Sequence, residues 1–245
     1  MTKVALIGYG KMGRMVKELS VRFPLEIVAI IDPLQDGCAK EISDTTLGDA
    51  EVCIEFSHPE AVLDNIKQVC KCKRNLVIGT TGWFNHLDEV KMLVEASGIG
   101  ALYGSNLSIG MNLFYEIVAK AARVFSLYDE YDVFGLEQHH RQKADSPSGT
   151  ARELGQILLD EMENKKSLQY GKPDGKIEAT ELHFASVRAG WIPGTHTVGF
   201  DSEADTIELT HRARNRSGFA IGALRAAMWV KDKKGMFSFR DFIRD

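Results

Sequence analysis

Short apolar runs alternate with longer amphipathic stretches over the first hundred residues. The amphipathic stretches carry apolar residues at helical spacing and predict helices over Met12–Ser20, Pro59–Cys72 and Asn85–Ser97. The short runs are apolar over nearly their whole length, which predicts strands buried on both faces at Val4–Ile7, Glu26–Ile31, Val52–Phe56, Leu76–Ile78 and Ile99–Tyr103. Strands that alternate with helices are typical of a Rossmann-type, doubly wound parallel sheet.

The pattern changes after Asn106. Helices are predicted from Ile109 to Phe125 and from about Ser148 to Asn164, and strands follow one another at Tyr131–His139, Ile177–Arg188, His196–Phe200 and Thr206–His211. Strands in succession predict a mixed or antiparallel sheet and hence a domain of the α+β type. A last helix, predicted at Ser217–Val230, would bury one face that carries Ile221, Leu224 and Met228.

We therefore expect an α/β protein of two domains. Residues 1–106 would form the Rossmann-type sheet, and residues 107–216 a second α+β domain that carries a mixed or antiparallel sheet. The tail, residues 217–245, is expected to return to the first domain. Two domains of this size have modest cores, so contacts between subunits are expected to add stability.

Composition narrows the class of protein without indicating a chemistry. The 245 residues are 44% hydrophobic and 26% charged, which excludes intrinsic disorder. A net charge of −4 provides no general attraction to nucleic acid or to an anionic membrane. The sequence enters a strand directly, without a signal peptide or a membrane-spanning run, and its four cysteines form no CxxC pair, so we expect a cytoplasmic protein with reduced thiols.

A glycine-rich loop follows the first predicted strand and opens the first predicted helix. It has G-x-G-x-x-G spacing, over Gly8, Tyr9, Gly10, Lys11, Met12 and Gly13. Glycine allows the tight turn and a close approach of the backbone to a pyrophosphate, and the helix N-terminus offers free N–H donors. A turn that merely joins strand to helix is the alternative, but the loop's context favours a dinucleotide site in the first domain.

The cofactor is expected to be NADH, with NADPH left open. Asp32 ends the second strand 19 residues after Gly13, where an acceptor for the ribose hydroxyls is expected. Its carboxylate would repel the 2′-phosphate of NADP, and Pro33 follows it, so that Lys11 is the one nearby cation. Two later strand ends should also face the cofactor, and they carry Gly79, Thr80, Thr81 and Gly82, and Ser105, Asn106, Leu107 and Ser108.

The segment from Glu137 to Ala151 holds the candidate catalytic groups. His139 and His140 would point to opposite faces of a strand, and Arg141 and Lys143 follow them. Thr150 to Glu153 fits a capping box at the start of a helix, whose free N–H groups suit a carboxylate. The segment thus offers a proton donor near neutral pH, cations and an anion site, although paired histidines are often structural.

A metal site is not expected, because adjacent histidines on a strand splay apart and no third ligand stands at a familiar spacing. His183, His196 and His211 lie on predicted strands and are interpreted as structural. Arg188 is left open between a substrate contact and a structural role.

The segment Glu137–Ala151 resembles the signature of the 4-hydroxy-tetrahydrodipicolinate reductase (dihydrodipicolinate reductase) family, roughly E-x-H-H-x-x-K-x-D-x-P-S-G-T-A. The resemblance covers almost the whole chain. It includes the glycine loop, Phe56–Glu60, Gly79–Gly82, Ser105–Ser108, Arg188–Gly190, Gly194–Thr197 and Phe219–Ala223.

The resemblance implies an NAD(P)H-dependent reductase of lysine and diaminopimelate biosynthesis. Its substrate would be the cyclic dihydrodipicolinate-type dicarboxylate, which it would reduce to tetrahydrodipicolinate. By the family pattern, His139 and Lys143 are catalytic, while His140, Gly149 and Thr150 bind the substrate. The resemblance also implies a homotetramer that assembles through the sheet of the second domain.

Departures from the family pattern bear on the cofactor. The glycine loop is one residue shorter than the G-x-x-G-x-x-G form, and Asp32-Pro33 replaces the Glu-Arg pair that some members use for both cofactors. Ser146 stands where Ala is common. Two alternatives remain open: another nicotinamide-dependent dehydrogenase of small amino or hydroxy acids, and a nucleotide sensor without turnover.

Overall fold

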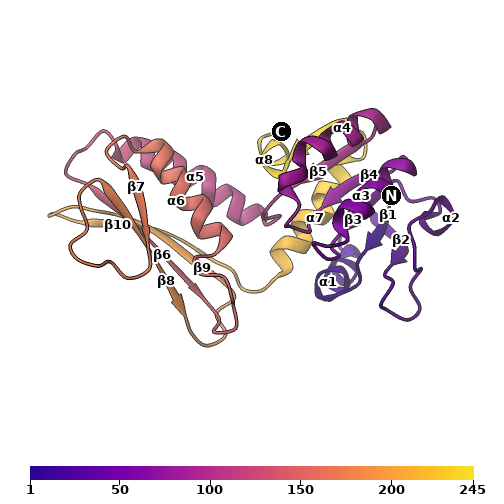
Figure 1. Cartoon of the computed structure of the whole chain (residues 1–245), viewed down its shortest axis with the longest axis horizontal. Coiled ribbons are helices and arrows are strands. Elements are labelled where there is room, and N and C mark those ends of the chain that lie inside the picture. The colour runs from indigo at the N-terminus through magenta and orange to yellow at the C-terminus, as the bar shows by residue number, and fades with distance from the viewer. The chain divides into compact units, whose positions relative to one another are not determined.

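The computed structural model describes residues 1–245, which divide into two compact units (Figure 1). One unit consists of Met1–Ile109 together with Ser217–Asp245, and the other of Gly110–Arg216. No helix is both long enough and apolar enough to span a bilayer.

The first unit is built on a six-stranded sheet in which every pair of neighbours is parallel. Its strand order is β11-β5-β4-β3-β1-β2, and its strands are β1 (Thr2–Ile7), β2 (Leu25–Ile31), β3 (Val52–Glu55), β4 (Asn75–Ile78), β5 (Gly100–Tyr103) and β11 (Gly235–Ser238). From β1 the chain continues to β2 on one side and then crosses to β3 on the other side of β1. The sheet is therefore doubly wound, as predicted.

Helices cover both faces of this sheet, as the apolar strands require. Along β1, Ala5 and Ile7 pack into one core, and Val4 and Leu6 pack into the other. The first core is completed by α2 (Asp44–Leu47), α3 (Val62–Lys71) and α4 (Leu87–Ser97), which follows the 3-10 turn η1 (Phe84–His86). The second core is completed by α1 (Lys11–Ser20), α7 (Ser217–Val230) and α8 (Phe239–Arg244).

The three predicted residues of α7 all pack onto the second core: Leu224 is buried, and Ile221 and Met228 are half-buried against it. Small residues, chiefly alanines, make up the rest of the buried face. The helix is apolar on nearly every side, so its pattern did not indicate these small residues. Small residues are needed on this face because the helix lies close to the segment that contains Leu107: a β-carbon on Gly222 would lie 1.7 Å from the carbonyl oxygen of Leu107.

The second unit is a five-stranded mixed sheet with two helices on one face (Figure 1). The strand order is β10-β9-β6-β8-β7, with β9 antiparallel to both neighbours and β8 parallel to both of its own. The elements are α5 (Ile109–Phe125), β6 (Asp132–His139), α6 (Gly149–Glu161), β7 (Ser167–Tyr170), β8 (Glu181–Arg188), β9 (Thr195–Asp201) and β10 (Thr206–Arg212).

Both helices pack their apolar sides onto this sheet. Phe114 and Val118 of α5 and Leu154 of α6 share a core with Phe184 and Phe200 of the strands. The α/β class with a second mixed sheet is therefore confirmed. The short elements α2, β7, β11 and α8 were not predicted.

Candidate active site

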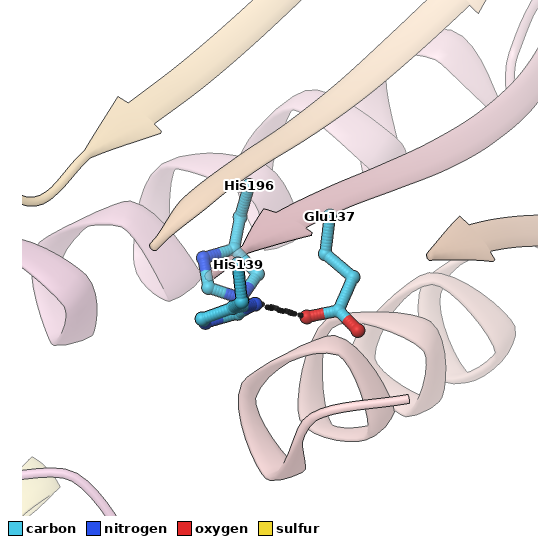
Figure 2. Close-up of side chains that lie close together, drawn as sticks. All are labelled: Glu137, His139 and His196. Atoms are coloured by element: carbon cyan, nitrogen blue, oxygen red, sulfur yellow. Dashed lines mark ion pairs between the residues drawn. The ribbon is translucent and has the colours of Figure 1, made fainter. Parts of the chain in front are cut away.

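The candidate active site of the second unit surrounds Glu137, a carboxyl that is completely buried. Side chains alternate along β6, so Glu137 and His139 lie on the same face of the sheet. The strand register places His196 of β9 and Ser186 of β8 opposite Glu137, and Arg188 of β8 opposite His139. Figure 2 shows the side chains of Glu137, His139 and His196 gathered at one point.

The first carboxylate oxygen of Glu137 accepts three hydrogen bonds. The donors are the backbone N–H of Ser148 at 3.0 Å, the hydroxyl of Ser186 at 2.8 Å and Nη2 of Arg188 at 2.7 Å. Burial alone would raise the pKa of Glu137, but the hydrogen bonds from His139, Ser148, Arg188 and Ser186 hold that pKa well below its usual range. The carboxyl is therefore ionised at neutral pH.

The second carboxylate oxygen faces the catalytic candidate His139. Nδ1 of His139 lies 2.7 Å from Oε2 of Glu137, the contact that the dashed line in Figure 2 marks. An anion at this place favours the tautomer with the proton on Nδ1, which leaves Nε2 to exchange a proton with a ligand. Gly194 lies beside Nε2: a β-carbon there would come within 3.1 Å of it. Glycine at position 194 thus keeps this side of the ring accessible.

His196 completes the cluster as a neutral group. Its ring stands edge-on to that of His139, with ring centroids 5.2 Å apart. Burial and the nearby His139 together lower the pKa of His196 to about 3, against the pull of Glu137. Nε2 of His196 lies 3.3 Å from the hydroxyl of Ser148. His196 therefore does not take up a proton at neutral pH. The structure places this histidine, which the sequence indicates to be structural, inside the cluster.

Ser148 connects this cluster to the start of α6. Its hydroxyl accepts a hydrogen bond of 3.1 Å from the backbone N–H of Ala151, so Ser148 is the N-cap of the helix. The predicted capping box of Thr150 and Glu153 is wrong, because the helix begins at Gly149 and Thr150 already lies within its first turn. A β-carbon on Gly149 would meet no atom within 4 Å, so the space beside the helix N-terminus is open.

The remaining residues of the segment lie in the turn between β6 and α6. Nζ of Lys143 pairs with Asp145 at 2.7 Å, and Arg188 donates to the carbonyl oxygen of Asp145 at 2.6 Å. His140 follows the end of the strand, and its backbone N–H donates to the carbonyl oxygen of Ile192 at 2.8 Å. These contacts fix the turn that carries Lys143 and His140, in the same unit as the cluster.

Glu137, His139 and His196 also match the donor set of a metal site. Their candidate ligand atoms lie within 4.8 Å of one another, and His196 comes from β9 rather than from a familiar sequence spacing. The separation of 2.7 Å between Nδ1 and Oε2 is that of a shared proton, and Arg188 already neutralises the carboxylate. We therefore interpret the cluster as proton-handling.

The first unit presents the glycine loop at the carboxyl end of β1. Gly8 has a φ of 89°, and a β-carbon on Gly13 would lie 2.1 Å from the carbonyl oxygen of Gly8. Both carboxylate oxygens of Asp32 accept backbone hydrogen bonds, from Tyr9 at 2.7 Å and from Leu34 at 2.8 Å. Asp32 thus connects the glycine loop to the loop after β2, and the residues present fit a dinucleotide.

A second cation lies near this edge, in addition to Lys11. The guanidinium of Arg14 donates to the side-chain oxygen of Gln35 at 2.7 Å, and it lies 4.9 Å from the ring centroid of Tyr9. Gln35 stands three residues after Asp32. The expectation that Lys11 is the one nearby cation was therefore wrong, because α1 brings Arg14 to the loop after β2.

The loops after β4 and β5 lie at the same edge of the sheet, since neighbouring strands are parallel. Thr80 is buried, and its carbonyl oxygen accepts a hydrogen bond of 2.9 Å from the indole of Trp83. Thr81 and Ser105 are exposed. Leu107 packs into the core with α7, so only its backbone is available to a ligand, and Asn106 accepts from the backbone N–H of Ser108 at 2.9 Å.

Family models match both units of the chain. The model described as dihydrodipicolinate reductase, N-terminus, matches residues 2–107, and the model for the C-terminus matches residues 110–243. The chain belongs to the dihydrodipicolinate reductase family. A 4-hydroxy-tetrahydrodipicolinate reductase of Christiangramia forsetii is 37% identical over 244 residues, which cover 99% of this chain and 98% of the relative. One of Neisseria gonorrhoeae is 36% identical over 204 residues, 82% of this chain and 75% of the relative.

Solved structures agree with the dihydrodipicolinate reductase fold. The dipicolinate-bound dihydrodipicolinate reductase of Paenisporosarcina sp. TG-14 superposes with a TM-score of 0.76 at 22% identity, over 98% of this chain and 99% of that one. An amine dehydrogenase of Mycobacterium smegmatis superposes with a TM-score of 0.63 at 10% identity, over 98% and 95%. The chain thus has the activity of its family, NAD(P)H-dependent 4-hydroxy-tetrahydrodipicolinate reduction in lysine and diaminopimelate biosynthesis.

The dihydrodipicolinate reductase signature identified some members of the cluster and not others. His139, Lys143 and Gly149 stand together in the sequence, and the fold keeps them in one unit. Ser186, Arg188 and His196 reach the cluster only through strand pairing. Their distance from His139 along the sequence gives no indication that they belong to the site. A signal did exist for Glu137: an acid two residues before a histidine on a strand shares its face.

Proposed function

We propose that the cluster around Glu137 is the acid–base centre of a cytoplasmic reductase that acts on the cyclic dihydrodipicolinate-type dicarboxylate. The observation that carries the proposal is the buried contact of 2.7 Å between Nδ1 of His139 and the ionised carboxylate of Glu137. This contact orients the ring of His139 and holds Nδ1 toward the carboxylate. Nε2 of His139, beside Gly194, is then the atom that exchanges a proton with the substrate.

When bound, the nicotinamide cofactor supplies the hydride that reduces the ring, and the protein's residues manage the proton and the charge. His139 donates or accepts a proton at Nε2. Lys143 provides a second proton at Nζ and a positive charge for the negative charge that develops on the ring. Both side chains belong to the same unit.

The substrate's carboxylates are proposed to bind at the start of α6. The backbone N–H groups of Gly149 and Thr150 stand at the positive end of the helix dipole, and Ser148 fixes the direction of this end. The open space beside Gly149 suits a planar dicarboxylate, and His140 of the same strand–turn–helix segment is proposed to contact it. The Paenisporosarcina relative is a dipicolinate-bound reductase, which supports a site for a pyridine dicarboxylate.

The cofactor site is proposed to consist of the glycine loop and the strand-end loops of the first unit. Its contacts would come from Gly8, Tyr9, Gly10, Lys11, Met12 and Gly13, from Asp32, from Gly79, Thr80 and Thr81, and from Ser105, Asn106, Leu107 and Ser108. Asp32 favours NADH, although its charge is shared with two backbone N–H groups, and Arg14 offers a cation for a 2′-phosphate. We therefore propose a preference for NADH with residual use of NADPH, which Arg14→Ala should reduce further.

A homotetramer is proposed to form through the sheet of the second unit. The helices α5 and α6 cover one face of this sheet, and the other face carries the exposed apolar side chain of Val187. Light scattering after size exclusion measures the mass directly. A single species of one chain's mass, 27.2 kDa, would contradict the proposal.

Turnover of NADH and of NADPH, with the product of aspartate-semialdehyde and pyruvate condensation generated in the assay, tests the function. His139→Gln should lower kcat by about a hundredfold or more, because it removes the proton donor. His183→Gln is the matched control: Nε2 of His183 contacts the carbonyl oxygen of Gly171 outside the cluster, and activity should be retained. Full activity of the His139 variant would refute the assigned role, and absence of turnover in the unchanged protein would refute the function.

A further inference from the structure

Glu55, the last residue of β3, carries a completely buried carboxyl that the reaction does not use. Its Oε1 accepts hydrogen bonds from the backbone N–H of Ser57 at 3.1 Å and from Nδ2 of Asn65 at 3.2 Å, and the hydroxyl of Ser57 donates to the same atom. Asn65 lies on α3 and also donates to the hydroxyl of Ser57, at 2.9 Å. The carboxyl thus connects the segment after β3 to a helix.

No cation stands against the carboxyl of Glu55. The side chains that act on it, Ser57, Thr80 and Asn65, are all uncharged, and burial raises the pKa of Glu55 above its usual range. Oε2 of Glu55 and the hydroxyl oxygen of Thr80 are both buried without another partner. The hydroxyl of Thr80 can donate to Oε2, or accept from it when the carboxyl is protonated, and either bond would connect Glu55 to the loop after β4.

The segment that Glu55 holds fills the space between two loops of the cofactor edge. A β-carbon on Gly8 would lie 2.3 Å from the carbonyl oxygen of Phe56, and one on Gly79 would lie 2.1 Å from the ring of Phe56. The backbone N–H of Gly79 donates to the carbonyl oxygen of Glu55 at 2.9 Å. Because β3 lies between β1 and β4, a shift of Phe56 would displace the glycine loop, the loop after β4, or both.

We infer that Glu55 is a positioning residue for the cofactor: its buried acid fixes the segment Phe56–Ser57, and this segment fixes the loops that receive the dinucleotide. The inference rests on the proposed cofactor site. It concerns affinity for NADH, since Glu55 itself is too deeply buried to touch a ligand.

Three variants separate this role from a general contribution to folding. Glu55→Ala removes the side-chain hydrogen bonds that hold the segment Phe56–Ser57. Glu55→Gln keeps an acceptor for Ser57 and Asn65 and offers a donor to Thr80. Glu51→Gln is the matched control, because Glu51 precedes the same strand at its other end and its carboxylate accepts from the backbone N–H of Lys3 at 2.9 Å. NADH titration by fluorescence gives the dissociation constant, and circular dichroism gives the folded fraction.

We expect Glu55→Ala to raise the dissociation constant of NADH about tenfold, the effect of one lost buried hydrogen bond of about 1.4 kcal/mol. The value of kcat at saturating NADH should change by less than about threefold, since the acid–base cluster is untouched. Glu55→Gln and Glu51→Gln should bind NADH within about twofold of the unchanged protein. A merely structural role would lower the folded fraction and leave the dissociation constant of the folded protein unchanged.

If Glu55→Ala does not fold, Ser57→Ala removes one donor alone and should weaken NADH binding by about threefold. Unchanged affinity in the folded Ala variants would overturn the inference while leaving the proposed function intact. A Gln variant that binds NADH as weakly as the Ala variant would overturn the role assigned to the hydrogen bonds that residue 55 accepts. If the unchanged protein fails to bind NADH, both the proposed cofactor site and this inference are refuted.

Discussion

Glu137→Gln removes one negative charge from the buried cluster and preserves the size of the side chain. The amide oxygen should take the place of Oε1, because Ser148, Ser186 and Arg188 all donate to that position. The amide NH2 group would then face Nδ1 of His139, which must become an acceptor and carry its proton on Nε2 instead. The substitution should therefore hold His139 in the opposite tautomer.

The cost follows from the burial of the pair. Glu137 is fully buried and the side chain of Arg188 is 17% exposed, so the loss of the anion leaves a cation with little solvent. Removal of one partner of a buried pair costs about 3–5 kcal/mol, and because Gln keeps an acceptor we expect the lower end, about 3 kcal/mol of the free energy of unfolding at pH 7. The loss of an oriented acid–base group should lower kcat by about a hundredfold to a thousandfold.

The pH dependence has a definite sign. In the folded chain the pKa of Glu137 lies below its usual value of 4.5, so the unfolded state takes up a proton first as the pH falls. The stability that Glu137 contributes is therefore complete above that value and is lost as the pH falls below it. The difference between the unchanged protein and the Gln variant should be largest at neutral pH and should shrink in acid.

Urea unfolding at a series of pH values measures this difference, and steady-state kinetics measure the tautomer effect. Glu181→Gln is the control: Glu181 lies on β8 of the same sheet, its carboxylate accepts only a surface backbone N–H from Glu178, and its loss should change stability by less than about 0.5 kcal/mol. Equal unfolding midpoints for the Glu137 variant and the unchanged protein at pH 7 would refute the reasoning. A difference that grows in acid would refute its sign.

Three further substitutions test other parts of the molecule. His196→Asn should lower kcat/KM without changing the shape of its pH profile between about pH 5 and 8, since the pKa of His196 is about 3; a lost inflection in that range would contradict this. Gly149→Ala should raise KM for the dicarboxylate about tenfold with no change in thermal unfolding, because its side chain meets only open space. Gly222→Ala should destabilise the protein by about 3 kcal/mol through contact with Leu107, whereas Gly175→Ala should be near neutral in the same denaturation assay.

Strong periodic patterns predicted the main elements of both sheets, whereas elements with a weak pattern were not predicted. The strand β7 (Ser167–Tyr170) is short, lies at an edge and buries no residue completely. The strand β11 (Gly235–Ser238) is likewise half-buried along its length, and only its pairing with β5 makes it a strand. Such segments become strands because the edge of a sheet is available to pair with them. Their own sequence does not show where that edge lies.

The site was predictable as far as its residues are neighbours in sequence. His139, Lys143 and Gly149 belong to one strand–turn–helix segment, whose chemistry can be inferred residue by residue. Arg188 and His196 enter from strands that pair with β6 in opposite directions, and their contacts depend on the register of each pairing. That register is decided by packing between distant segments, so their role at the site could not be derived from spacing.

The two buried glutamates of this chain show how partners decide the state of the same group. Glu55 and Glu137 are both completely buried near the carboxyl end of a strand, and burial disfavours the charge of both. Only Glu137 has a cation against it, Arg188 at 2.7 Å, and its pKa falls while that of Glu55 rises. An ionised carboxylate suits a residue that must orient a histidine. Glu55 is held instead by uncharged donors on Oε1, and burial without a cation is what raises its pKa.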